Sequence, residues 1–245
     1  MNIFDKYIGE TIKICREYPL QKLSRPEKLW PIQEKNPFLM ERDTAVELGG
    51  YPRESINLIL PSSGLREQAE TGQAKKLLEG VYCIGNPHIM DGTQSHVSFG
   101  KIVLIETADI TDDALYDFTQ AELLTDARIR MKDVMIRQSP THYNINLRVG
   151  KAALLAGFDA ATLGWTVYEA FYRMEKVKSV TVILILGESR LYKALLDVGE
   201  KVKEATLTLN HIFDGIEMDC GHCEQKDICS EIEGMRALHK RKLRK

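Results

Sequence analysis

The longest apolar run in the chain, Val180–Leu186, spans only seven residues, and this limits what the chain can fold into. A short run rich in β-branched residues and followed by Gly187 is typical of a strand that is buried on both faces. It is far shorter than the ~20 residues that a membrane-spanning helix needs. We therefore expect a buried strand at 179–186 and no membrane span.

Other strand and helix patterns alternate along the chain. Further strands are expected at 54–60, 81–84, 96–106 and 143–149, and helices at 3–17, 65–79, 150–156, 159–176, 188–205 and from 111 onward. Five prolines predict an extended arm over 18–52. We expect the strands at 143–149 and 179–186 to share one sheet, with a right-handed crossover if they are parallel.

This order of elements predicts a fold of the α+β or α/β class, arranged in three parts. The first, 1–125, is an N-terminal α+β part that includes the proline-rich arm. The second, 126–209, is a mixed α/β sheet layer. The third, 210–245, is a short C-terminal segment with a cysteine metal knot and a basic helical tail.

Charge is unevenly distributed along the chain. Residues 236–245 carry six basic and no acidic residues, whereas the other 235 residues carry 27 basic and 35 acidic residues, a net charge of −8. An acidic body argues against a nucleic-acid-binding face. The basic tail fits either an acidic partner or RNA, or a solvated, frayed end. Since residues 1–6 lack a basic and apolar leader, we expect a cytoplasmic location.

Three of the five cysteines fall within ten residues. Cys220, Cys223 and Cys229 form the pattern C-x2-C-x5-C, with His222 inside the first pair. Such spacing allows the thiolates to bind the same metal ion or cluster. Structural zinc sites and [4Fe–4S] clusters normally take four protein ligands, so a fourth is needed. The candidates are Cys83, Cys15, His222 and His211, or a ligand from outside the chain, and both zinc and iron–sulfur remain open.

Two other places could hold a ligand. His88, Asp91 and His96 lie in one glycine-containing stretch, which is either a mononuclear metal site or a hydrogen-bonded loop between two strands. Gly187 stands between a strand and a helix, where α/β folds often bind ligands, and His142 and Lys151 flank the strand at 143–149. No nucleotide-binding glycine motif accompanies them.

Several segments together resemble a known family. They are Phe38–Glu41 leading to Glu47–Gly50, Tyr143–Ala152, Gly157–Phe158, Leu163–Tyr168 and Val177–Ile185. They resemble the middle region of the acetyl-CoA synthase subunit of CO dehydrogenase/acetyl-CoA synthase, most clearly its strand-helix-helix unit. The cysteines lie where that family begins its cluster-binding domain, and the likeness covers residues 38–229.

The resemblance implies an acetyl-CoA-synthase-like iron–sulfur protein of one-carbon and corrinoid metabolism. It favours a [4Fe–4S] cluster on Cys220, Cys223 and Cys229 over zinc, and a corrinoid or methyltransferase protein as partner. The family joins CO, a methyl group and coenzyme A, using four cluster cysteines and a Cys-Gly-Cys nickel motif. This chain has three clustered cysteines and no Cys-Gly-Cys, so we do not expect a complete synthase. The alternative is a non-catalytic binding or docking module stapled by a zinc or iron–sulfur knot.

Overall fold

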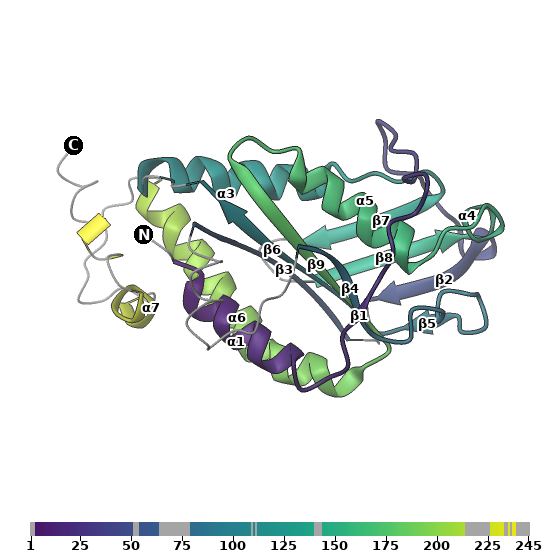
Figure 1. The fold of residues 1–245 in the computed structure, drawn as a ribbon, viewed down its shortest axis with the longest axis horizontal. Coiled ribbons are helices and arrows are strands. Elements are labelled where there is room, and N and C mark those ends of the chain that lie inside the picture. Colours follow the sequence, from purple (N-terminus) through teal and green to yellow (C-terminus); the bar gives the residue numbers. More distant parts are fainter. Residues whose placement is uncertain are drawn as a thin grey trace.

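The computed structural model describes residues 3–50, 54–63, 79–108, 110, 112–139, 144–213, 226–232, 235 and 237–238. Over these residues the chain forms a mixed α+β fold with two mixed sheets and six α-helices (Figure 1). The helices are α1 (Asp5–Cys15), α3 (Asp112–Ala127), α4 (Lys151–Leu155), α5 (Ala160–Tyr172), α6 (Ser189–Phe213) and α7 (Lys226–Glu231). None of the helices in these ranges combines the length and apolarity required to cross a bilayer.

The larger sheet has five strands in the order β1-β4-β9-β6-β3. Its central strand β9 pairs in parallel with β4 and antiparallel with β6, and β6 pairs in parallel with β3. The short edge strand β1 is antiparallel to β4. The bounds are β1 (Gln21–Lys22), β3 (Ser55–Ser62), β4 (Gly80–Gly85), β6 (Phe99–Thr107) and β9 (Val177–Leu186).

The smaller sheet has four strands in the order β5-β2-β8-β7. Strand β8 is antiparallel to both β2 and β7, and β2 is parallel to the short β5. The bounds are β2 (Thr44–Gly49), β5 (His96–Val97), β7 (Val134–Ser139) and β8 (Asn144–Gly150). Strands from both 1–125 and 126–209 therefore contribute to each sheet.

The prediction that the strands at 143–149 and 179–186 share one sheet is wrong, because β8 and β9 belong to different sheets. The reason lies in their side chains. From Ser179 onward β9 is buried at every position, as a central strand requires. In β8 the residues Asn144, Asn146 and Arg148 alternate with buried apolar residues, so this strand can bury only one face.

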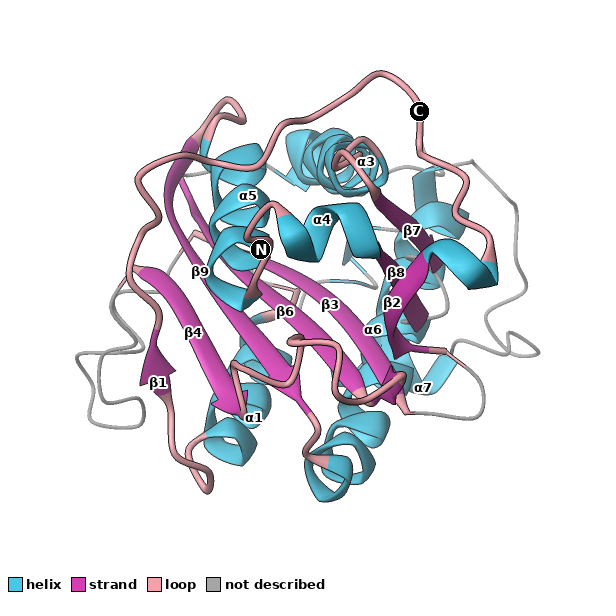
Figure 2. Cartoon of the chain, turned by 90° about the vertical axis from the view of Figure 1, so that its right-hand side faces the viewer, coloured by secondary structure: helices cyan, strands magenta, loops and turns pink. Residues whose placement is uncertain are grey.

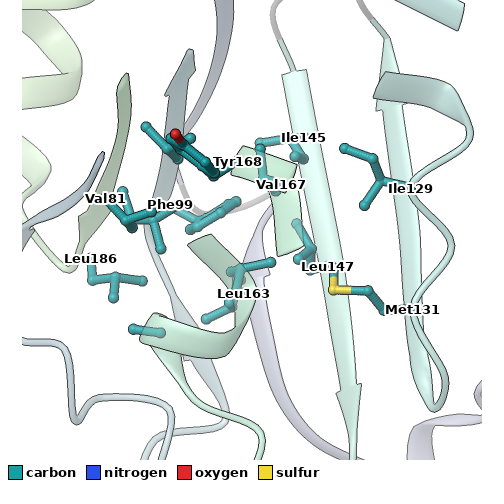
Figure 3. Packing of buried hydrophobic residues seen from close by; sticks show 14 of the residues in the cluster. Val81, Phe99, Ile129, Met131, Ile145, Leu147, Leu163, Val167, Tyr168 and Leu186 are labelled. Carbon is teal, nitrogen blue, oxygen red and sulfur yellow. The ribbon is translucent and has the colours of Figure 1, made fainter. Parts of the chain in front are cut away.

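The five-stranded sheet separates two apolar cores. On one face, alternate residues of its strands pack against α1, α6 and α7. On the other face, the intervening residues pack against α5 and the inner face of the four-stranded sheet. Figure 2 shows α1 and α6 on one side of this sheet and α5 on the other. Figure 3 shows the second core, where Leu163 and Val167 of α5 lie between Val81 and Leu186 on one side and Ile145 and Leu147 on the other.

Several predicted elements are confirmed with shifted ends. The helix expected at 159–176 ends at Tyr172, and Lys176 adopts a left-handed conformation (φ 70°) just before β9 begins. The helix expected at 188–205 continues to Phe213. The arm at 18–52 is largely extended, but it also contains β1 and β2, which its sequence pattern does not indicate. The helix expected at 65–79 lies outside the described residues, except for Glu79.

Gly85, at the end of β4, is expected to tolerate no side chain. Its φ is +92°, and a Cβ there would lie 2.0 Å from the carbonyl oxygen of Leu186 on the neighbouring strand. We expect Gly85→Ala to lower the free energy of unfolding by about 1–3 kcal/mol, measured by urea denaturation. The control is Gly9→Ala in α1, where nothing lies within 4 Å and a gain of about 0.5–1 kcal/mol is expected. Equal effects of the two substitutions would contradict the close approach at Gly85.

Candidate functional site

The clustered cysteines lie near the C-terminal end of the sequence. Cys220, His222 and Cys223 fall outside the described residues, whereas Cys229 lies within α7. This short helix packs against α6, and its buried Ile228 contributes to the core on that side of the five-stranded sheet. The backbone that carries the third cysteine is therefore attached to the body of the protein.

The two isolated cysteines are core residues. Cys83 in β4 is fully buried, and its thiol donates a weak hydrogen bond to the carbonyl oxygen of Ile84 at 3.6 Å. Cys15 is equally buried at the last position of α1. Burial raises the pKa of each thiol to about 12. Since a metal ligand is a thiolate, these environments disfavour both residues as ligands.

Cys83 is also on the wrong face of the sheet to meet Cys229. Its side chain belongs to the core shared with α5, whereas α7 belongs to the core on the opposite face. His211 is better placed, since it lies in the last turn of α6, the helix that α7 contacts. No three His, Cys, Asp or Glu side chains converge as a metal-binding group in the described parts of the chain.

The stretch around His88, Asp91 and His96 forms a hydrogen-bonded loop from β4 to β5. The Asp91 carboxylate accepts bonds from the backbone N–H and the hydroxyl of Thr93, at 2.8 and 2.6 Å, and these bonds lower the pKa of Asp91. Nε2 of His96 lies 3.2 Å from Oε2 of Glu47 in β2. These partners hold the loop, and the structure does not bring the two histidines and Asp91 together as a metal site within the described residues.

The other two described candidates also serve local structure. Lys151 donates a 2.8 Å hydrogen bond to the carbonyl oxygen of Arg42 at an exposed position. Gly187 adopts φ +81° at the junction of β9 and α6, and its N–H donates to the carbonyl oxygen of Ser98. His142 lies outside the described residues.

The described residues line an open cleft of ≈ 620 Å³ between the two sheets and α6, which we call the inter-sheet cleft. This volume is in the usual range for small-molecule sites. Its walls come from the start of β3, the ends of β7 and β8 that face it, and the first turns of α6. The lining residues are Gly50, Glu54, Ser55, Arg137, Gln138, Asn144, Ile145, Asn146, Tyr192 and Leu196.

A buried charged network lies behind one wall of the cleft. Lys101 of β6 forms an ion pair with Asp126 of α3, and both side chains are almost completely buried. Asn57 donates a 3.1 Å hydrogen bond to the same carboxylate. Lys101 also donates to the side-chain oxygen of Gln138 at 3.4 Å. Gln138 therefore connects the buried ion pair to the cleft, which it also lines.

Glu122, one turn before Asp126 in α3, is buried without a hydrogen-bond partner for Oε2 among the described residues. Burial, with a smaller contribution from the nearby Asp126 carboxylate, raises its pKa well above the usual 4.5. The folded protein therefore keeps this proton at pH values where the unfolded chain releases it. Its contribution to the free energy of unfolding is fully present below about pH 4.5 and is lost as the pH rises.

Glutamine cannot ionise, so we expect Glu122→Gln to remove the loss of unfolding free energy that occurs as the pH rises. The variant should be more stable than the wild type near neutral pH, and the difference should shrink towards about pH 4, as measured by urea denaturation across that range. Glu204→Gln, at an exposed position of α6, is the control and should follow the wild type. Parallel pH profiles for Glu122→Gln and the wild type would show that folding does not raise the pKa of Glu122.

No protein-family model and no curated protein sequence matches this chain.

Proposed function

We propose that this chain is an iron–sulfur protein of the acetyl-CoA-synthase type, in which Cys220, Cys223 and Cys229 hold a cluster of the [4Fe–4S] kind. The observation that carries the proposal is the C-x2-C-x5-C run, which ends in a helix packed on the body of the protein. Three thiolates within ten residues suit a cluster, and the fixed positions of α6 and α7 reduce the entropy lost when the segment between them closes around it.

The fourth ligand is proposed to be a histidine or a group from outside the chain. Cys83 and Cys15 are disfavoured by their burial and raised pKa, and Cys83 also by its position behind the sheet. His222 adjoins Cys223 in sequence, and His211 lies in the last turn of the helix that α7 contacts. An exogenous fourth ligand would leave one cluster iron open to exchange.

In this proposal the protein works beside a corrinoid or methyltransferase protein in the cytoplasm and is not a complete synthase. The Cys-Gly-Cys that holds nickel in the resembled family has no counterpart in this sequence. The alternative function is a non-catalytic docking module, in which the same cysteines bind zinc and staple the C-terminal segment to α6. The attachment of α7 to the body supports both functions equally.

Elemental analysis separates the two functions. Full-length protein purified without air should contain iron and acid-labile sulfide and show broad visible absorbance if the first proposal is correct. One zinc ion per chain, without iron or visible colour, would instead establish the docking module. Protein that contains neither metal, even after anaerobic reconstitution with iron and sulfide or incubation with zinc, would overturn both.

A further inference from the structure

The outer edge of β7 is covered by the proline-rich arm rather than by another strand. β7 is the last strand of the four-stranded sheet, and β8 pairs with it on one side only. Just before β7 begins, Ile32 of the arm forms an antiparallel bridge with Met131. The N–H of Gln33 donates a 2.8 Å hydrogen bond to the carbonyl oxygen of Arg130. The arm therefore starts to pair with this edge as a strand would.

Further along the edge, a side chain takes the place of this backbone pairing. Nδ2 of Asn36 donates a 2.6 Å hydrogen bond to the carbonyl oxygen of Ile136, and Oδ1 of Asn36 accepts a 3.0 Å bond from the Ile136 N–H. The Asn36 amide thus supplies one donor and one acceptor, as a peptide group of a neighbouring strand does. Pro37 follows directly and has no N–H, so the backbone of the arm cannot continue the ladder at this point.

The backbone groups on this edge form a pattern that is complementary to itself. In an antiparallel pair, alternate residues of each strand point their N–H and C=O groups away from the partner. Asp133 accepts a hydrogen bond from the N–H of Gly150 at the end of β8, so the even-numbered residues of β7 face the outer edge. They are Val134, Ile136 and Gln138. Two copies of β7, placed antiparallel about Ile136, would exchange two bonds between the Ile136 residues and further bonds between Val134 and Gln138.

Exposed apolar side chains accompany the covered edge. Ile32 and Phe38 lie on either side of Asn36 in the arm, and they are 55% and 77% exposed. Glu34 and Lys35, which lie between Ile32 and Asn36, are charged and exposed, as is common where proteins protect a sheet edge. Exposed apolar residues beside a strand edge favour association of two molecules once the edge becomes free.

We propose that Asn36 guards the edge of β7 against strand pairing, and that the partner it excludes is β7 of a second copy of this chain. Without the Asn36 amide, the N–H and the carbonyl oxygen of Ile136 lose the partners that the structure gives them. The same groups of a second copy can replace these partners. The two copies then form a two-fold dimer in which β7 pairs antiparallel with itself and joins the two four-stranded sheets.

The test is the oligomeric state of full-length Asn36→Ala, measured by sedimentation over a range of protein concentrations. This variant should form a concentration-dependent dimer at concentrations at which the wild type and Lys35→Ala remain monomers. Lys35→Ala is the matched control, because Lys35 is also exposed and adjoins Asn36 in the arm. The proposal would be overturned if Asn36→Ala stayed monomeric, or if the wild type or Lys35→Ala dimerised equally.

Amide hydrogen exchange and a second substitution identify the surface that pairs. In the Asn36→Ala dimer, the Gln138 amide should exchange at least about tenfold more slowly than in the wild type, because it pairs with Val134 of the second copy. Asn36→Ala combined with Ile136→Pro should stay monomeric, because proline removes the N–H that faces the edge, where a strand tolerates proline. A dimer without slower exchange at Gln138 would show that a different surface associates, and the assignment to β7 would be wrong.

Discussion

Replacing Lys101 by methionine is expected to lower the free energy of unfolding by about 3–5 kcal/mol. The substitution leaves the Asp126 carboxylate buried without its counter-charge, since Asp126 is 0% and Lys101 only 4% exposed in their side chains. The hydrogen bond from Asn57 remains, but it does not neutralise the charge. Urea denaturation near neutral pH measures the loss. Lys178→Met, at an exposed position of β9, is the matched control and should change stability by less than about 0.5 kcal/mol.

A double variant distinguishes the loss of the pair from the loss of packing. Lys101→Met combined with Asp126→Leu removes both charges, and it should be more stable than Lys101→Met alone because no unpaired carboxylate is left. If Lys101→Met were as stable as Lys178→Met, or if the second substitution gave no recovery, the buried ion pair would not exist in the form described.

Replacing Cys223 by alanine is expected to abolish metal binding. Only two clustered thiolates would remain, one fewer than the proposed cluster site uses. Because the free energy of metal binding becomes local folding free energy, the segment from about residue 210 onward should also become more susceptible to proteolysis. Elemental analysis and limited proteolysis of the purified variant measure the two effects.

Cys83→Ala and Cys15→Ala are the controls for that experiment. Each removes a thiol from a fully buried core position, so each should cost stability while the metal content stays at the wild-type level. Loss of metal in Cys83→Ala would make this residue the fourth ligand, against its position on the far face of the sheet. Wild-type metal content in Cys223→Ala would contradict the proposed site itself.

Strands β3, β4, β6, β8 and β9 could be predicted from the sequence, but β1, β2 and β7 and the distribution of the strands between the sheets could not. The continuous apolar run of β9 and the alternation in β8 were both visible in the sequence, and together they indicated strands with two buried faces and with one. β9 pairs with β4 and β6, apolar strands from the first half of the chain, whereas β8 pairs with β2 and β7. Because β8 and β9 are close in sequence, they were expected to share a sheet. They lie in different sheets because β9 is buried on both faces, whereas β8 buries only one.

The inter-sheet cleft could not be predicted because its walls come from four separate segments. Each segment alone has the composition of an ordinary strand end or exposed helix turn, and Arg137 or Asn144 gives no signal of its own. One signal was present: Lys101 interrupts the apolar stretch from Phe99 to Ile105 in β6, and a charge at such a position needs a partner. Its partner Asp126 lies 25 residues away in a helix, which the sequence pattern does not specify.

X-ray absorption at the iron edge of the anaerobically purified, full-length protein tests the central claim most directly, because it reports the atoms bound to the metal. For a cluster on Cys220, Cys223 and Cys229, the spectrum should show iron surrounded mainly by sulfur together with iron–iron scattering, and Cys223→Ala should lose both. Iron bound only by oxygen and nitrogen, or an absence of iron beside a zinc signal with sulfur ligands, would contradict the assignment of an iron–sulfur protein.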